Sequence, residues 1–224
     1  ATVALLIPSA VSFADSTTAA AFTQSLSLGL AVLLILTYGL GMFFSLKTHK
    51  EFFASSGQGD EGGHEEAWPV GLALGTLACV TVFVALVSEI FVESVQEAAK
   101  TFGMSSAFVG FIVVGLVGGA AEMASAFSGA RKNRLDLSIG IALGSASQIA
   151  LFVAPVLVLL SYLVGPHPMD LRFWPGAVVM MLIATLTTTT LTVGGRSAWF
   201  LGVLVLMVYL IFAISLYLLP VGAA

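Results

Sequence analysis

Long apolar stretches separated by short polar segments dominate the chain. A helix needs about 20 apolar residues to cross the hydrocarbon core of a bilayer. Six stretches reach that length, at residues 25–46, 69–92, 106–127, 138–163, 174–193 and 198–219. None alternates apolar and polar residues with a period of two, which does not favour a β-barrel. Because backbone polar groups in lipid must be bonded within the protein, the pattern predicts an all-α, polytopic transmembrane helical bundle.

A shorter apolar segment precedes these spans. Residues 1–14 lack the basic first region of a signal peptide, and Ala1 is not an initiator methionine. We therefore interpret residues 1–24 as the end of a truncated transmembrane segment followed by an external loop. On this interpretation the sequence is a fragment of a longer protein.

The composition supports an integral membrane protein. Of 224 residues, 58% are apolar and 9% are charged, against about 25% charged in soluble domains. This excludes a soluble enzyme and a disordered chain. The eight Lys and Arg residues form no basic face, so we expect no nucleic-acid partner. Nucleophile elbow, HExxH and P-loop motifs do not occur, and we predict neither an enzyme nor a resident cofactor.

Lysine and arginine in the loops predict the orientation, because cytoplasmic loops are enriched in both residues. One side carries Lys47, Lys50, Arg131, Lys132, Arg134 and Arg196, and the other carries Lys100 and Arg172. This imbalance assigns the loops 47–68, 128–137 and 194–197 to the cytoplasm. The C-terminus then lies on the external or luminal side.

The loop 47–68 is the only long polar linker. Its acidic residues are Glu51, Asp60, Glu61, Glu65 and Glu66. Two interpretations stay open: a solvated connector, or a segment that collects cations at the cytoplasmic surface. The acidic residues lack the spacing of an EF-hand.

Two carboxyl groups fall inside the predicted spans, where a charge is costly and therefore calls for a functional or structural reason. Glu89, preceded by Ser88, lies near the outer end of its span, and Glu93 follows one turn later. This pair is either interfacial or part of an ion path. Glu122 lies nine residues before Arg131, roughly 13 Å into the bilayer at 1.5 Å per residue.

Small residues surround Glu122. Gly115, Gly118 and Gly119 precede it. Such residues let helices approach closely. They also favour an unwound turn, whose carbonyl oxygens together with a carboxylate would suit a hard cation. The alternative is a protonated Glu122 that serves as a hydrogen-bonded structural group.

The next span carries polar side chains at a similar depth. Ser145 and Gln148 are three residues apart and share a helix face. They could line a site with Glu122 or bond neighbouring helices. Gly140 and Gly144 form a small-residue face, and Pro155 is expected to kink this span. The threonines at 185 and 187–190 are expected to bond the carbonyl four residues earlier.

Three motifs in order resemble the second repeat of CAX-type Ca²⁺/H⁺ antiporters, within the Ca²⁺/cation antiporter superfamily. They are Gly118-Gly119-Ala120-Ala121-Glu122, Arg131-Lys132-Asn133-Arg134-Leu135-Asp136-Leu137 and Gly144-Ser145-Ala146-Ser147-Gln148-Ile149-Ala150-Leu151-Phe152. The Ser88-Glu89 pair, the acidic linker and the late Gly195-Arg196-Ser197-Ala198-Trp199 turn agree with that family. The resemblance covers nearly the whole chain.

The resemblance implies a site and a mechanism. It makes residues 69–224 a five-helix inverted repeat, 25–46 the preceding helix and 47–68 the cytoplasmic linker. Glu122, Ser145, Gln148, Gly118 and Gly119 would bind the cation, and Ser88, Glu89 and Glu93 would line the proton and cation path. Protons and Ca²⁺, or a related divalent cation, would compete for the carboxylates during alternating access. Gly119 and Met123 replace the family's usual Asn and His, which leaves the preferred ion open.

The resemblance also implies partners and a location. They are the lipid bilayer, Ca²⁺ and H⁺ as substrates, and an N-terminal repeat of the same protein that supplies a second carboxylate. Assembly into a homo-oligomer stays open. The membrane would be the plasma membrane in a prokaryote and the vacuolar membrane in a eukaryote. Two alternatives remain: a Na⁺-coupled exchanger of the same superfamily, and a non-transporting half-size subunit that needs a partner.

Overall fold

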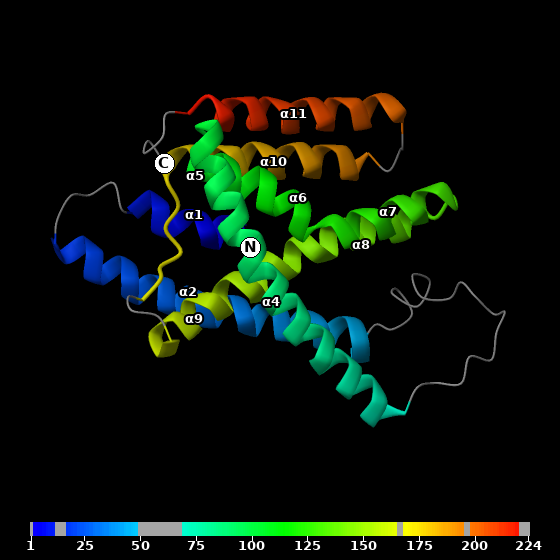
Figure 1. Cartoon of the computed structure of the whole chain (residues 1–224), viewed down its shortest axis with the longest axis horizontal. Helices are drawn as coiled ribbons and strands as arrows, with labels where there is room; N and C mark the ends of the chain where they lie inside the picture. The colour runs from blue at the N-terminus through cyan, green and yellow to red at the C-terminus, as the bar shows by residue number, and fades with distance from the viewer. Residues whose placement is uncertain (1, 12–16, 49–68, 165–167, 195–197, 220–224) are drawn as a thin grey trace. The chain divides into compact units, whose positions relative to one another are not determined.

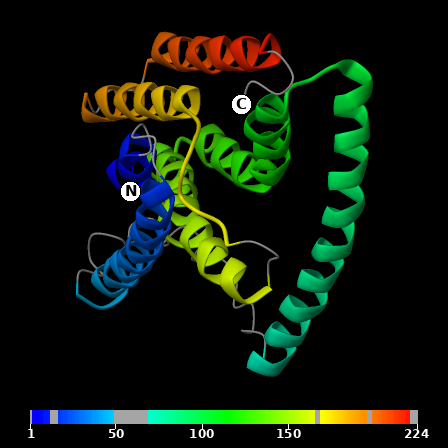
Figure 2. The same ribbon diagram turned by 90° about the vertical axis from the view of Figure 1, so that its left-hand side faces the viewer.

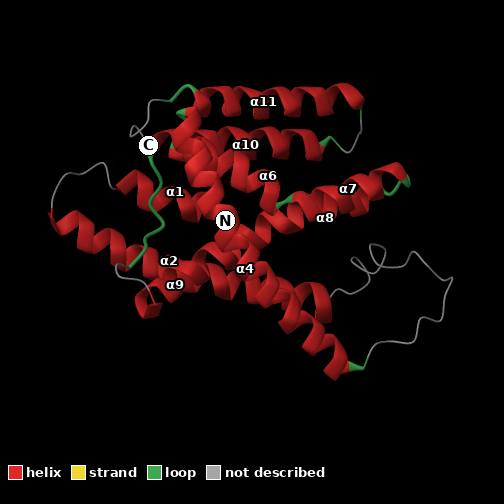
Figure 3. Ribbon diagram, viewed as in Figure 1, coloured by secondary structure: helices red, strands yellow, loops and turns green. Residues whose placement is uncertain are grey.

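A computed structural model describes residues 2–11, 17–48, 69–164, 168–194 and 198–219. These residues are helical or in short connections, and they contain no strand (Figure 3). Five helices are long and apolar enough to cross a membrane, or six if the bent pair 106–118 and 120–131 forms one span. The prediction of an all-α, multi-span membrane protein is confirmed.

The described helices follow the apolar pattern of the sequence (Figure 1). In chain order they are α1 (Thr2–Val11), α2 (Thr17–Phe43), the π-helical η1 (Phe44–Thr48), α4 (Val70–Phe102), α5 (Ser106–Phe108), the π-helical η2 (Val109–Val114), α6 (Gly115–Gly118), α7 (Ala120–Arg131), α8 (Leu135–Gln148), the π-helical η3 (Ile149–Val153), α9 (Ala154–Val164), α10 (Pro175–Val193) and α11 (Trp199–Tyr217).

Two helices extend past their predicted spans. Helix α2 begins at Thr17, eight residues before the predicted start of its span, and the part that could cross a membrane is Phe22–Thr48. Helix α4 continues to Phe102, beyond the predicted end at 92. Hydropathy marks the hydrocarbon limits, but a helix continues into polar surroundings while its residues favour helix. At about 50 Å, α4 is longer than a hydrocarbon core of about 30 Å.

The chain divides into two compact units. The first contains residues 1–57 and 119–210, and the second contains residues 58–118 and 211–224. This division follows backbone contacts, and its boundary at Gly118 and Gly119 falls inside the repeat expected over 69–224. The repeat boundaries stay a prediction. Most of the acidic linker 47–68 lies outside the described residues.

The first unit is organised around α2. Helix α2 packs against η3 and α9, and α1 contacts α2 and α10 (Figures 1 and 2). The buried apolar cluster consists of Leu5, Ala31, Leu34, Val158 and Leu171. Tyr38 of α2 and Phe152 of η3 add a ring contact with centroids 5.3 Å apart. Helices separated by more than a hundred residues therefore share one core.

Three buried serines anchor the segment between α9 and α10. The Ser161 hydroxyl accepts a hydrogen bond from the Met169 N–H at 2.8 Å. Ser27 accepts from the Leu171 N–H at 3.1 Å, and Ser9 accepts from the Phe173 N–H at 2.8 Å. Backbone groups of a non-helical segment need such partners when they are buried.

The second unit contains α4 and the helix start that follows it. Gly103 closes α4 in a left-handed conformation, with φ of 63°, which glycine adopts without steric cost. Ser105 then caps the next helix by accepting from the Phe108 N–H at 3.1 Å. The same hydroxyl donates to the Leu216 carbonyl at 2.6 Å. These bonds fix the turn between α4 and α5 to the end of α11.

Threonine and proline act on the local helix geometry. Thr185, Thr188 and Thr190 donate to the carbonyl four residues earlier at 2.7–2.8 Å, which confirms their predicted structural role. Pro155 is the second residue of α9, just after the π-helical η3. Because proline has no N–H, it leaves one carbonyl of the preceding turn without its α-helical partner. A local π segment is a common response to such a disturbance.

Candidate cation site

The α7–α8 hairpin positions the predicted site residues. Its turn depends on Asn133, which has a φ of 60°. The Asn133 N–H donates to the Ala130 carbonyl at 3.0 Å, and the Arg134 N–H donates to the Gly129 carbonyl at 2.9 Å. The sequence analysis missed this role for Asn133. A signal was present, because asparagine tolerates the left-handed conformation better than most residues.

Gly129 sets the register of the hairpin. It is buried, and a Cβ at this position would lie 3.6 Å from the Ser138 nitrogen. In an antiparallel pair, residues at equal distances from this contact lie at equal depth. The register therefore places Glu122 level with Ser145 and Gly119 level with Gln148. Equal depth follows from the hairpin, although it does not by itself bring side chains into contact.

The span that carries Glu122 is broken at one residue. Helix α6 ends at Gly118 and α7 begins at Ala120. Between them, Gly119 has φ and ψ of −92° and 7°. The Gly119 carbonyl accepts from the Met123 N–H at 2.9 Å. A break of this kind leaves carbonyls of the ending helix and N–H groups of the starting helix without intrahelical partners.

Glu122 lies in the first turn of α7. Its side chain is half-buried, and its Oε2 atom is fully buried with no hydrogen-bond partner among the described residues. A buried polar atom without a partner costs about 1–3 kcal/mol, and more when the group is charged. The helix N-terminus offsets part of the cost for a negative charge. The oxygen is therefore available to a proton or a cation.

Ser145 and Gln148 provide further oxygen atoms on α8. Ser145 is half-buried and Gln148 is exposed. Neither is a hydrogen-bond partner of Glu122 Oε2. The hairpin thus brings the three residues to neighbouring levels but leaves them without a direct bond.

The glycines near the site face open space in the described chain. A Cβ added at Gly118, Gly140 or Gly144 would meet nothing within 4 Å. Close helix packing at these glycines, one of the two interpretations from the sequence, is therefore absent within the described residues.

Ser88, Glu89 and Glu93 lie on α4, which belongs to the second unit. All three side chains are exposed. Glu89 and Glu93 are four residues apart and share one helix face. The described residues contain no group of three or more His, Cys, Asp or Glu side chains able to hold a metal. A cation site built from this chain alone would therefore rest on Glu122 with neutral oxygen ligands.

Comparisons with known proteins agree with the motifs. The model of the sodium/calcium exchanger protein family matches residues 72–218. A Ca²⁺/H⁺ antiporter of Aphanothece halophytica is 36% identical over 99% of this chain and 62% of its own length. The antiporter ChaA of Bacillus subtilis is 39% identical over 87% of this chain and 56% of its own length.

A solved structure shares the fold. The structure of YfkE, which is described as a Ca²⁺/H⁺ antiporter protein, superposes with a TM-score of 0.77 at 36% identity. It covers 97% of this chain, while this chain covers 59% of YfkE. The chain therefore spans less than two thirds of the length of these relatives.

Proposed function

The chain belongs to the sodium/calcium exchanger protein family, and on that premise we propose that it forms the second repeat of a secondary active transporter. This transporter exchanges Ca²⁺, or a related divalent cation, for H⁺ across a membrane by alternating access. The buried Glu122 Oε2 without a partner, beside the helix break at Gly119, is the observation that carries the proposal. It is the kind of group that either substrate would satisfy.

In the proposed site, H⁺ and Ca²⁺ compete for the Glu122 carboxyl group. A proton on Glu122 removes the negative charge that holds Ca²⁺, and bound Ca²⁺ displaces the proton. Calcium takes six to eight oxygen ligands, as a typical value for proteins. The Ser145 hydroxyl, the Gln148 amide and carbonyls freed near Gly118 are the candidate neutral ligands in this chain. Ser88, Glu89 and Glu93 are the proposed path residues on α4.

Further ligands are needed beyond those of this chain. The N-terminal repeat implied by the resemblance is the proposed source of a second carboxylate. The open space beside Gly118, Gly140 and Gly144 supports the proposal, because small residues permit close helix approach. The half-size subunit with a separate partner is the alternative arrangement of the same contacts. Homo-oligomeric assembly is compatible with either arrangement.

Orientation and location are proposed from charge. The loops 47–68, 128–137 and 194–197 lie in the cytoplasm and the C-terminus lies outside or in a lumen, because cytoplasmic loops carry more Lys and Arg. The membrane is the plasma membrane if the source is prokaryotic and the vacuolar membrane if it is eukaryotic.

Transport by a Glu122→Gln variant tests the proposal. The intact protein is placed in vesicles with an imposed proton gradient, and uptake of radioactive Ca²⁺ is measured. The variant is expected to abolish uptake, because Gln keeps the shape but neither charges nor releases a proton. Glu97→Gln, at an exposed position on α4, is the matched control and should retain uptake. Full uptake by the Glu122 variant would refute the site.

Sodium is the competing coupling ion, and the description of the matching family favours testing it. The same vesicles receive either a proton gradient or a Na⁺ gradient at constant pH. Ca²⁺ uptake driven by protons alone supports the proposal. Uptake driven by Na⁺ alone would assign the chain to the Na⁺-coupled alternative.

A further inference from the structure

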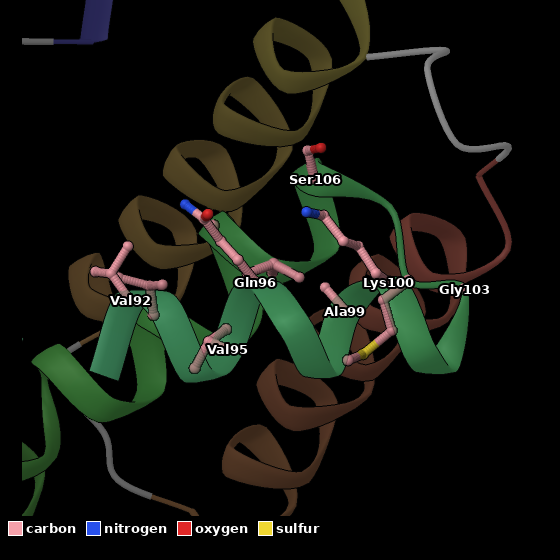
Figure 4. A pocket seen from close by; sticks show the side chains of 11 residues that line it. Val92, Val95, Gln96, Ala99, Lys100, Gly103 and Ser106 are labelled. Atoms are coloured by element: carbon pink, nitrogen blue, oxygen red, sulfur yellow. The ribbon is translucent and has the colours of Figure 1, made fainter. Parts of the chain in front are cut away.

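A groove in the second unit is not used by the proposed transport mechanism. It lies between the last turns of α4 and the segment formed by α5 and η2 (Figure 4). Its volume is about 640 Å³, within the range of about 300–1,000 Å³ typical of small-molecule sites. Hydrogen bonds of Gly103 and Ser105 close the end of α4 and cap the start of α5 beside this groove.

One end of the groove is polar. Gln96 and Lys100 are one helical turn apart on α4, and their polar ends extend to the same side, where Ser106 lies (Figure 4). Lys100 forms no ion pair among the described residues. An ammonium group with a neighbouring amide and hydroxyl group is a set of donors that suits a phosphate.

The other end of the groove is apolar. Val92 and Val114 line it. Each lies eight residues from the polar end, Val92 from Lys100 and Val114 from Ser106. At 1.5 Å per residue this is about 12 Å along each helix. Gly110, between these levels, leaves the wall open, since an added Cβ would meet nothing within 4 Å.

We propose that this groove binds one anionic phospholipid. The polar end lies at a helix turn that follows an apolar span, which is where lipid headgroups are found, and the apolar end runs toward the hydrocarbon. The phosphate would accept from Lys100, Gln96 and Ser106. One acyl chain would lie along Val92, Gly110 and Val114. A phospholipid has the same arrangement, with a charged headgroup followed by an apolar acyl chain.

The positive charge of Lys100 disfavours binding of a transported cation in the groove. Glu93 and Glu97 lie seven and three residues before Lys100, within about 60° of it around α4, but neither is among the residues that line the groove. The groove shares no lining residue with the cation site proposed around Glu122.

Native mass spectrometry of the full chain tests this inference. The protein in detergent is titrated with dioleoyl phosphatidylglycerol, and with dioleoyl phosphatidylcholine as the neutral comparison. Lys100→Gln is expected to weaken phosphatidylglycerol binding about fivefold, from the loss of one cation near an anionic headgroup. Phosphatidylcholine binding should change less. Arg172→Gln, which removes a cation outside the groove, is the matched control and should leave both lipids unaffected.

A variant that fills the apolar end of the groove distinguishes binding of a lipid from binding of a free phosphate ion. Gly110→Leu is expected to weaken both lipids, because the added side chain occupies the acyl path, and Gly75→Leu at an open position of α4 should not. Circular dichroism and elution volume check that each variant folds. Equal phosphatidylglycerol binding by wild type and Lys100→Gln would overturn the proposal. Lipid displacement by millimolar inorganic phosphate, with no effect of Gly110→Leu, would also overturn it.

Discussion

Two groups of buried polar atoms in the first unit have opposite environments. The hydroxyl groups of Ser9, Ser27 and Ser161 each accept a backbone N–H of the segment before α10. The Glu122 Oε2 atom is buried without any partner among the described residues. Both groups belong to the same unit, so membership in a packed region does not explain the difference.

The comparison separates a structural role from a binding role. Paired hydroxyl groups stabilise the fold, and their loss leaves buried or partly buried N–H donors without a partner. An unpartnered carboxyl oxygen costs stability in the free chain and recovers it when a ligand binds. We therefore expect the serines to control unfolding and Glu122 to control the response to Ca²⁺.

The largest expected effect concerns Ca²⁺ itself. In the intact protein, free Ca²⁺ at 100 times its dissociation constant should stabilise the folded state by about 2.7 kcal/mol. Glu122→Gln should remove this gain, and Ser27→Ala should keep it. Melting curves in detergent with and without Ca²⁺ measure the effect. If Ca²⁺ raised the melting temperature of the Glu122 variant as much as that of the wild type, Glu122 would have no role in Ca²⁺ binding.

Removal of a serine hydroxyl should have the next largest effect. Ser161 accepts from the Met169 N–H at 2.8 Å and donates to the Val158 carbonyl at 2.7 Å. Ser161→Ala removes the acceptor of the partly buried Met169 N–H and should lower the free energy of unfolding by about 1 kcal/mol. Without Ca²⁺, Glu122→Gln should change it much less. Equal losses in the two variants, measured by denaturant titration, would show that the two environments do not differ as described.

An added ligand at the break should give an effect no larger than this. Gly119 has a φ of −92°, which other residues adopt without strain. Gly119→Asn places an amide oxygen one turn from Glu122 and should lower the KM for Ca²⁺ about fivefold, equivalent to about 1 kcal/mol. Uptake rates over a range of Ca²⁺ concentrations measure it. Gly115→Asn is the control, and an identical change there would contradict a local ligand effect.

The smallest effect is expected at the threonines of α10. Thr188 donates to the Ala184 carbonyl at 2.8 Å on an exposed helix face. This bond stays within one helix and joins no other part of the chain. Thr188→Ala should change the free energy of unfolding by less than about 0.5 kcal/mol. The denaturant titration used for Ser161 applies. A loss as large as that of Ser161→Ala would mean that i−4 bonds stabilise this protein as strongly as the long-range serine bonds.

Hydropathy predicted the existence of the helices better than their limits. The stretches 174–193 and 198–219 correspond closely to α10 and α11, because both helices begin and end near the limits of their apolar runs. Helices α2 and α4 extend past the predicted spans 25–46 and 69–92, since their polar or small extensions carry no hydropathy signal. The sequence did not decide where among the glycines the helix breaks, and the structure locates the break at Gly119.

The candidate site was predictable in its residue types but not in its bonding. A carboxyl group about 13 Å inside a span is costly to place in the bilayer, and that cost alone indicates a function. Ser145 and Gln148 share its depth because a short turn joins the two helices. The groove at Lys100 was missed, since a single lysine after an apolar span contributed only to the charge count. The i, i+4 spacing of Gln96 and Lys100 before Gly103 was the available signal.

The sequence by itself determined the membrane environment, the helical class and the family motifs, because each depends on local composition and short spacing. Only the tertiary structure decided which polar atoms have partners. Ser27 and Leu171 are 144 residues apart, and their bond forms only when α2 packs beside α9. The buried Glu122 Oε2 and the groove beside Lys100 likewise depend on how helices pack, which sets side-chain direction and burial beyond the reach of spacing along the chain.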